Sequence, residues 1–253
     1  GEVEEEGAHG YDPRTTCPRA AARGQAARAR LPVAMTRFFN TTGPCVPEWH
    51  YMLPPEARLP EVDTLVARYQ YFVVHAARQT GKTTAMRALA ARFRGQGMVA
   101  LHATLEASQG EGEVAAAEAR WISAIELAAR ELTVGDRPCA APSAAPGTRF
   151  SAWLQAWAEA VAPRPLVLFL DEADVVRGEA LVNLLRQLRA GFHLRPSHFP
   201  ASVALVGMRD LRDYLAAAKD GTPVNPGSPF NIKAKSLTLP AFTESEVAAL
   251  YAQ

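Results

Sequence analysis

The chain has 253 residues, of which 48% are hydrophobic and 21% are charged, so it carries enough apolar material for one core of domain size. Its 27 basic and 26 acidic side chains leave a formal net charge of +1, and bulk charge therefore gives no support for nucleic-acid binding. No stretch approaches the roughly 20 apolar residues of a membrane-spanning helix, so we expect no membrane partner. The 3 cysteines lie far apart without C-x-x-C spacing, which favours a reducing, cytoplasmic setting.

Residues 1–34 precede the predicted domain. They open with an acidic cluster, Glu2–Glu6, and continue as an Ala/Arg-rich run that has neither a strand period nor an amphipathic-helix period. We therefore expect a disordered extension. Met35 is the first methionine and the candidate natural start. A transit peptide over residues 13–34 is the competing interpretation, although no compact amphipathic pattern supports it.

From Leu59 onward, helical and strand patterns alternate along the chain. Strands are predicted at residues 71–75, 97–105, 166–170, 202–206 and 232–239. Helices are predicted at residues 60–69, 82–94, 113–132, 150–162, 179–190 and 210–217, with Pro/Gly/Ala-rich loops at 137–147 and 220–229. Thr243 and Glu246 form a capping-box pattern that predicts a last helix running to the end. Repeated strand and helix, with a non-alternating apolar strand at 166–170, predicts a doubly wound α/β domain.

The strand at 71–75 is followed by a phosphate-loop pattern, G-x-x-x-x-G-K-[ST], in which Ala76 replaces the first glycine. Backbone N–H groups of such a loop turn inward around phosphates, and Gly81 lets the chain approach closely. Lys82 supplies a positive charge for the β- and γ-phosphates, and the Thr83 hydroxyl is placed to ligate magnesium. The flanking strand and helix favour this over a chance helix cap. The predicted nucleotide-binding residues are Ala76, Ala77, Arg78, Gln79, Thr80, Gly81, Lys82, Thr83 and Thr84.

An acidic pair, Asp171 and Glu172, ends the strand at 166–170, in the crevice where open α/β sheets bind ligands. We expect Asp171 to hold magnesium, usually through water, and Glu172 to polarise the attacking water as a general base. A solvated acidic turn is the alternative for a strand end taken alone. Its combination with the phosphate loop favours a nucleotide-hydrolysing site.

Three further residues have two interpretations each. Arg209, after the strand at 202–206, is a candidate catalytic sensor that distinguishes triphosphate from diphosphate by charge. The alternative is a surface ion pair with Asp213, four residues further on. His50 and Tyr51, in a proline-flanked aromatic cluster, either contact the adenine or anchor the N-terminal segment to the core.

These motifs together resemble the AAA-like and STAND branches of the P-loop ATPases, within the AAA+-related ASCE division. The resemblance spans residues 36–253 and is carried by Ala77–Thr84, Leu170–Glu172 and Gly207–Asp210, and also by Arg37–Asn40, His50–Pro55 and Ser228–Ile232. It implies a three-layer α/β/α P-loop NTPase with a mostly parallel sheet, in which the acidic and sensor strands lie beside the phosphate-loop strand. It also implies ATP as the nucleotide, with Mg²⁺, and a helical lid at whose start the chain ends.

The expected organisation has four parts: an extension at 1–34, a segment at 35–58 that packs near the adenine site, an ATPase core at 59–240, and the start of the lid at 241–253. The resemblance implies a magnesium-dependent ATPase that acts as a nucleotide-controlled switch. Its expected partners are ATP and ADP, a protein or further domains, and other copies in an oligomer. Arg195, Arg209 and Arg212 are equal candidates for an arginine finger.

Three alternatives to this function stay open. One is a nucleotide-binding regulatory or scaffold module with negligible hydrolysis. Another is a DNA-linked AAA+ ATPase. The third is a helicase, because residues 171–174 spell the DEAD motif, but neither a Ser-Ala-Thr motif nor a second motif-bearing domain accompanies it. We therefore interpret Asp174 as an early-helix acid that interacts with the helix dipole.

Overall fold

One five-stranded sheet organises the described chain, with strand order β2-β3-β4-β1-β5. The strands are β1 (Tyr71–His75), β2 (Val99–Thr104), β3 (Leu166–Asp171), β4 (Ser202–Gly207) and β5 (Lys233–Thr238). Every neighbouring pair is parallel, so all carboxyl ends meet at one edge. The sheet confirms the predicted α/β fold. It also places the sensor strand β4 between the acidic strand β3 and the phosphate-loop strand β1.

The computed structural model describes residues 36–209 and 232–253, and Arg37–Gln253 forms one compact unit. The predicted extension at 1–34, the helix at 210–217 and the loop at 220–229 lie outside the described residues. Arg212 and Asp213 lie outside them as well. Within the described parts of the chain, no helix is both long and apolar enough to cross a membrane.

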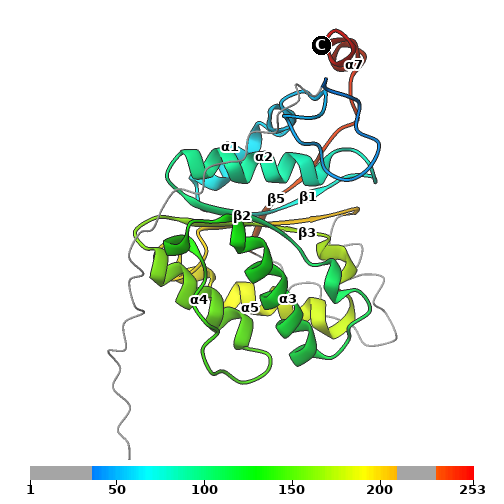
Figure 1. Cartoon of the computed structure of the whole chain (residues 1–253). Coiled ribbons are helices and arrows are strands. Elements are labelled where there is room, and N and C mark those ends of the chain that lie inside the picture. Colours follow the sequence, from blue (N-terminus) through cyan, green and yellow to red (C-terminus); the bar gives the residue numbers. More distant parts are fainter. Residues whose placement is uncertain (1–35, 210–231) are drawn as a thin grey trace, which may run out of the picture. The chain divides into compact units, whose positions relative to one another are not determined.

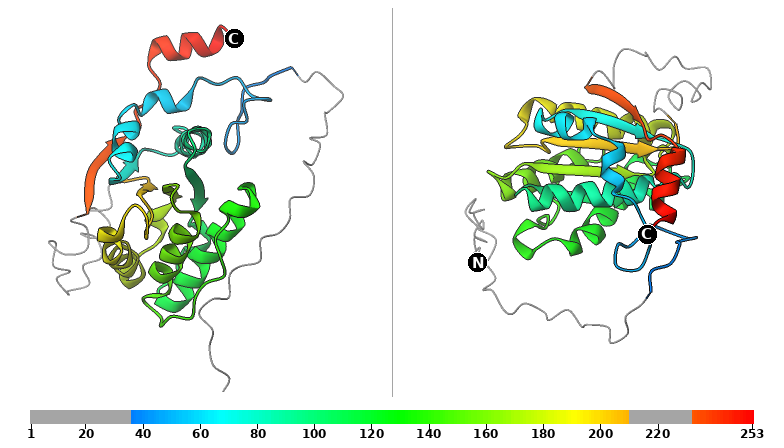
Figure 2. Two further views of the ribbon diagram at one scale, coloured as in Figure 1. Left: turned by 90° about the vertical axis from the view of Figure 1, so that its left-hand side faces the viewer. Right: turned by 90° about the horizontal axis from the view of Figure 1, so that it is seen from above.

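Helices cover both faces of the sheet, as Figures 1 and 2 show. On one face lie α1 (Glu61–Ala67) and α2 (Lys82–Gly95), and on the other lie α3 (Val114–Ala128), α4 (Arg149–Val161) and α5 (Gly178–Ala190). The last helix, α7 (Glu244–Tyr251), follows β5. Single 3-10 turns occur at Pro55–Arg58, Glu106–Ser108, Ala129–Glu131, Val134–Asp136, Ala173–Val175 and Phe192–Leu194. The result is the three-layer arrangement that the resemblance implied.

Alternation along β3 explains how one sheet carries two cores. Leu168 packs into the core formed with α3, α4 and α5, whereas its neighbours Val167 and Phe169 pack into the core formed with α1 and α2. All six residues of β3 and of β4 are buried. Each large apolar side chain buried in this way contributes roughly 1.5–3 kcal/mol relative to exposure. These two buried strands hold the residues that follow them in fixed positions.

Two element ends show how local polar groups set helix boundaries. The capping box predicted at Thr243 and Glu246 is confirmed, since both of its hydrogen bonds are present. The helix predicted at 113–132 is shorter than expected, because it gives way to a 3-10 turn at Ala129. The Arg137 guanidinium donates to the carbonyls of Arg130 and Leu132, and this satisfies backbone acceptors that a continuing helix would have used.

Candidate nucleotide-binding site

The phosphate loop connects β1 to α2 at the carboxyl edge of the sheet. Gln79 and Gly81 take positive φ values of 61° and 88°, and these left-handed residues turn the loop back toward the start of α2. Ala76, which replaces the usual first glycine, has a negative φ and donates its N–H to the Gly207 carbonyl of β4. Alanine is therefore compatible with the backbone at this position.

Lys82 places its charge inside the loop. Its side chain is buried, and the ammonium donates to the carbonyls of Ala76 and Ala77 over 2.8 Å each. The Thr80 hydroxyl donates to the Ala77 carbonyl, while Ala77 and Arg78 are exposed. A buried ammonium that neutral carbonyls satisfy is positioned to exchange these partners for the negatively charged oxygens of a phosphate.

Asp171, the last residue of β3, receives hydrogen bonds from three directions. The Thr83 hydroxyl donates to its Oδ2 over 2.6 Å, His102 Nε2 lies 3.2 Å from the same oxygen, and the Glu172 N–H donates to Oδ1 over 2.9 Å. Burial by itself would raise the pKa of Asp171, but the hydrogen bonds from His102 and Thr83, the charge of His102 and the Glu172 N–H together hold it below its usual value. The carboxylate is therefore kept ionised beside the phosphate loop.

Sequence reasoning missed His102. The available signal was a histidine near the end of the largely apolar strand β2, which pairs with the acidic strand β3. Because a carboxylate only accepts hydrogen bonds, the contact with Asp171 requires a proton on His102 Nε2. His102 thereby restrains the orientation of the predicted metal ligand.

Glu172 is half-buried and adopts a left-handed backbone conformation, with φ 55° and ψ 34°. Such strain in a non-glycine residue is common at functional sites, where surrounding structure fixes it. Burial raises the pKa of the Glu172 carboxyl, the charges of Asp171 and Asp174 raise it further, and Lys82 opposes them. A raised pKa makes this carboxylate a better proton acceptor.

Asp174 lies in the first turn of a short 3-10 helix, as an early-helix acid would, but its hydrogen-bond partner comes from outside that helix. Asp174 is buried in the 3-10 turn Ala173–Val175, and its Oδ2 accepts the Met208 N–H over 3.0 Å, because this turn packs against the end of β4. A Cβ on Gly207 would lie 2.9 Å from Asp174 Cγ, so glycine is required there for this close approach. Arg209 follows as an exposed residue, and its alternative partner Asp213 is not among the described residues.

A hollow of about 730 Å³ opens beside the loop, within the usual range for small-molecule sites. Its walls come from the N-terminal segment, from the phosphate loop and from the last part of the chain. The lining residues are Phe39, Asn40, Thr41, Thr42, Gly43, Cys45, Tyr51, Met52, Leu53, Pro55, Arg58, Gln79, Gly81, Thr84, Phe242 and Leu250. The loop thus continues into a cavity large enough for the rest of a nucleotide.

His50 and Tyr51 have different positions. Tyr51 lines the hollow. His50 is buried, its Nδ1 accepts the Val46 N–H over 2.8 Å, and its ring lies edge-on to Phe38 at 4.8 Å. These contacts favour the anchoring interpretation for His50. The Cys45 N–H donates to the Thr84 hydroxyl over 3.1 Å, which joins the N-terminal segment to the start of α2.

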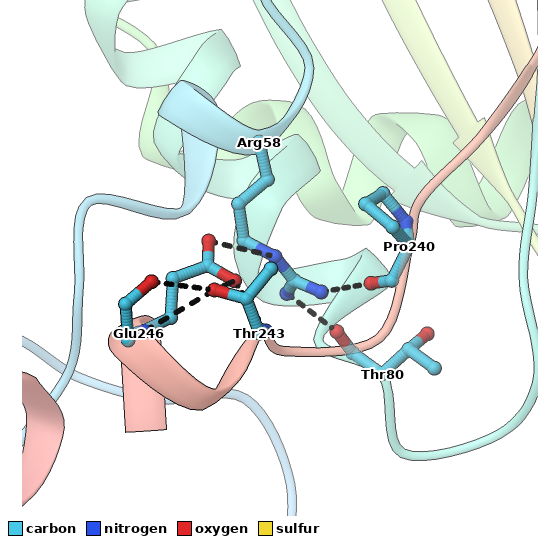
Figure 3. A network of polar contacts seen from close by, with 6 residues as sticks. Arg58, Thr80, Pro240, Thr243 and Glu246 are labelled. Atoms are coloured by element: carbon cyan, nitrogen blue, oxygen red, sulfur yellow. Dashed lines mark hydrogen bonds and ion pairs between the residues drawn. The ribbon is translucent and has the colours of Figure 1, made fainter. Parts of the chain in front are cut away.

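Arg58 is a second residue that sequence reasoning missed. Its side chain lies in the wall of the hollow and contacts both the phosphate loop and the start of α7, as Figure 3 shows. Burial lowers the pKa of the Arg58 guanidinium, and Glu246 opposes that shift. No motif marks this arginine, because its partners come from distant parts of the chain.

Comparison with known proteins agrees with this geometry. A family model described as an AAA domain matches residues 67–215, which is more than half of the chain. No curated protein sequence matches. Among solved structures, a Walker-type ATPase of Pyrococcus abyssi is 14% identical with a TM-score of 0.53, over 84% of this chain and 60% of that one. Drosophila ORC bound to poly(dA/dT) DNA and Cdc6 is 13% identical with a TM-score of 0.53, over 79% of this chain and 31% of that one.

At these identities the solved structures show the fold alone. The chain spans 60% and 31% of the length of the two structures. The family match is independent of them, and it covers β1, the phosphate loop, β3 with its acidic pair, and β4. The chain belongs to the AAA domain family of P-loop ATPases.

Proposed function

We propose that this domain binds ATP with Mg²⁺ and hydrolyses it to ADP and phosphate, and that the nucleotide state switches its conformation. The observation that carries the proposal is the 2.6 Å hydrogen bond between Thr83 Oγ1 and Asp171 Oδ2. This bond brings the start of α2, whose first residue is Lys82, against the acidic end of β3. A phosphate-binding loop and an acidic strand end thereby face each other.

The donor set at this point fits a magnesium ion. One hydroxyl, of Thr83, and one carboxylate, of Asp171, are the kind of oxygen ligands with which Mg²⁺ is held when phosphates and waters complete its shell. Among residues 36–209 and 232–253, no group of three or more His, Cys, Asp or Glu side chains could hold a metal by itself. When bound, the ion would neutralise charge on the β- and γ-phosphates.

The chain's own groups would then bind, orient and accept a proton. Backbone N–H groups of the loop and the Lys82 ammonium hold the phosphates. Glu172 orients a water whose oxygen bonds to the γ-phosphorus as the bond to the β–γ bridging oxygen breaks, and its carboxylate accepts the water's proton. Arg209 is proposed to sense the γ-phosphate, and Tyr51 to contact the adenine. Their placement at the end of β4 and in the wall of the hollow supports these roles.

The STAND-type switch is part of the proposal. It rests on the sequence resemblance and on the position of α7, whose Leu250 lines the same hollow as Gln79 and Gly81 of the loop. A ligand in this hollow would contact elements from both ends of the chain. Protein partners and further domains would read the resulting change, and the oligomeric state and an arginine finger belong to the same proposal.

Calorimetry with ATP and ADP, with and without Mg²⁺, tests binding. We expect Lys82→Ala to weaken ATP binding about tenfold or more, because a charge-assisted contact is worth roughly 1.5–3 kcal/mol. Lys235→Ala is the matched control. Lys235 is an exposed lysine on the edge strand β5, and it forms an ion pair with Glu61 of α1. Equal affinity of wild type and Lys82→Ala would contradict the site.

Phosphate release separates hydrolysis from binding alone. Glu172→Gln keeps the size of the side chain but removes the proton acceptor, so we expect ATP affinity to be retained and turnover to be lost. If wild type binds ATP but releases no phosphate above the level of Glu172→Gln, the domain is a nucleotide-binding regulatory module.

A DNA-linked AAA+ ATPase is the second candidate. It is favoured by the structural similarity to Drosophila ORC, which was solved in a complex with DNA. The net charge of +1 gives it no support. Duplex DNA should raise the rate of phosphate release if this candidate is correct. An unchanged rate and no mobility shift of the DNA would remove it.

A further inference from the structure

Arg58 joins three segments that are far apart in sequence, and the proposed reaction does not use it (Figure 3). Its side chain is only 4% exposed. Nη1 donates to the Thr80 carbonyl over 3.0 Å, and Nη2 donates to the Pro240 carbonyl. Nε lies 3.9 Å from Glu246 Oε1, and the guanidinium lies 4.0 Å from the centre of the Phe242 ring. One cation thus links the phosphate loop to the segment that leads into α7.

The contact with Thr80 fixes a peptide group of the phosphate loop. The Thr80–Gly81 bond is trans, so its C=O and N–H point in opposite directions. Because Arg58 holds the Thr80 carbonyl, the Gly81 N–H points away from the guanidinium. A Cβ at Gly81 would lie 3.8 Å from Arg58 Nη1, so the guanidinium lies on the side of this left-handed glycine where a side chain would be. Arg58 therefore restrains an N–H that a phosphate loop uses.

The contacts at the other side restrain α7. Glu246 uses Oε2 to accept the Thr243 N–H over 2.7 Å and presents Oε1 toward Arg58. No residue of α7 is buried. The helix also contacts the N-terminal segment through the rings of Tyr251 and Phe39, whose centroids lie 5.2 Å apart, and hydrogen bonds beyond its end join Gln253 to Met52. A helix with so little buried apolar surface depends strongly on each polar contact.

We propose that Arg58 is a positioning residue through which a nucleotide on the phosphate loop controls the docking of α7. The inference rests on the proposed nucleotide binding. The planar guanidinium offers several N–H donors in fixed directions, so it holds Thr80 and Pro240 at once, which a lysine ammonium on a flexible stem does not reproduce. Because coupling is reciprocal, a ligand that orders the loop strengthens the docking of α7, and a docked α7 strengthens ligand binding by the same factor.

Hydrogen exchange of residues 244–251 in the full chain, read by mass spectrometry with and without saturating ATP and Mg²⁺, measures the docking. In wild type we expect ATP to slow exchange. In Arg58→Met, hydrogen exchange of these residues without ATP should be roughly tenfold faster than in wild type, and ATP should no longer slow it. Calorimetry should show that this variant binds ATP roughly tenfold more weakly. Arg58→Lys should behave like Arg58→Met, since it keeps the charge but loses the fork.

Arg92→Met is the matched control, because Arg92 pairs with Asp63 on the surface and should leave both readouts as in wild type. Slow exchange of β3 amides shows that a variant is folded, and Arg58→Lys decides the question if Arg58→Met does not fold. If ATP slows hydrogen exchange of α7 in the Arg58 variants as much as in wild type, the coupling is overturned, while the proposed nucleotide binding is unaffected. If Lys82→Ala binds ATP as tightly as wild type, the proposed function is overturned, and the coupling that rests on it is overturned too.

Discussion

His102 Nε2 lies 3.2 Å from Asp171 Oδ2, the same oxygen that accepts the Thr83 hydroxyl. The contact crosses from β2 to β3, which pair in parallel with Thr104 opposite Asp171. The same carboxylate oxygen is therefore held by one side chain from β2 and one from α2. Residues that orient a metal ligand contribute to metal affinity although they do not touch the ion.

ATP binding should tighten as Mg²⁺ is added, and we expect His102→Leu to raise the Mg²⁺ concentration needed for this by about tenfold. Side chains that hydrogen-bond to metal ligands usually contribute at least that factor to metal affinity. ATP binding in EDTA should change much less, since Lys82 and the loop amides remain. Calorimetry over a series of Mg²⁺ concentrations measures both. His198→Leu, which removes an exposed histidine paired with Glu159, serves as control. An equal loss of affinity in EDTA would show that His102 shapes the whole loop instead.

Gly207→Ala should destabilise the fold, because the new Cβ would lie 2.9 Å from Asp174 Cγ and force the end of β4 or the 3-10 turn to move. Overpacking of this kind costs roughly 1–3 kcal/mol. Urea unfolding monitored by tryptophan fluorescence measures the change. Gly135→Ala is the control, since a Cβ there has no atom within 4 Å. Equal stability of the two variants would mean that the contact between Asp174 and Met208 adapts without strain.

The pair of Asp136 and Arg164 should make stability depend on pH. The hydrogen bond from Arg164 lowers the pKa of Asp136, so the stabilisation is fully present above the carboxyl's unfolded value near 3.9 and is lost as pH falls through the lower folded value. Because Arg164 is partly exposed, we expect Asp136→Asn to cost only about 0.5 kcal/mol at pH 7.

Urea unfolding at pH 7, 5, 4 and 3 measures this difference, which should narrow toward zero at the lowest pH. Asp63→Asn is the control, because the Asp63 side chain is half exposed in its pair with Arg92. If the difference in unfolding free energy between wild type and Asp136→Asn stays constant down to pH 3, the lost stability comes from packing of the 3-10 turn at Val134–Asp136 and not from the charge.

Local motifs made half of this site predictable from sequence. The strand, loop and helix around Lys82 are contiguous, and so are β3 and its acidic pair, so their residue types alone indicated their chemistry. The positions of His102 and Arg58 depend on strand order and on the return of the chain end to the loop, which periodicity does not encode. The partner of Asp174 could not be predicted for the same reason: it is the N–H of Met208, one residue after the end of β4.

Arg209 offers a test of whether the end of β4 senses the γ-phosphate. It follows Met208, whose N–H is fixed by Asp174, so its backbone starts from a restrained position although the residue is exposed. If its charge reaches the γ-phosphate, Arg209→Ala should weaken ATP binding about tenfold and leave ADP binding unchanged, since only the triphosphate carries the group it contacts.

Paired calorimetric titrations with ATP and ADP give this ratio directly. Arg186→Ala, which removes an exposed arginine from α5, controls for the change in net charge and should leave the ratio unaltered. The surface alternative, a pair with Asp213, makes the opposite prediction: both affinities stay as in wild type, and only the stability changes, by roughly 0.2–0.5 kcal/mol. Because a long-range charge effect would weaken ATP and ADP together, a selective loss of ATP binding requires direct contact with the terminal phosphate.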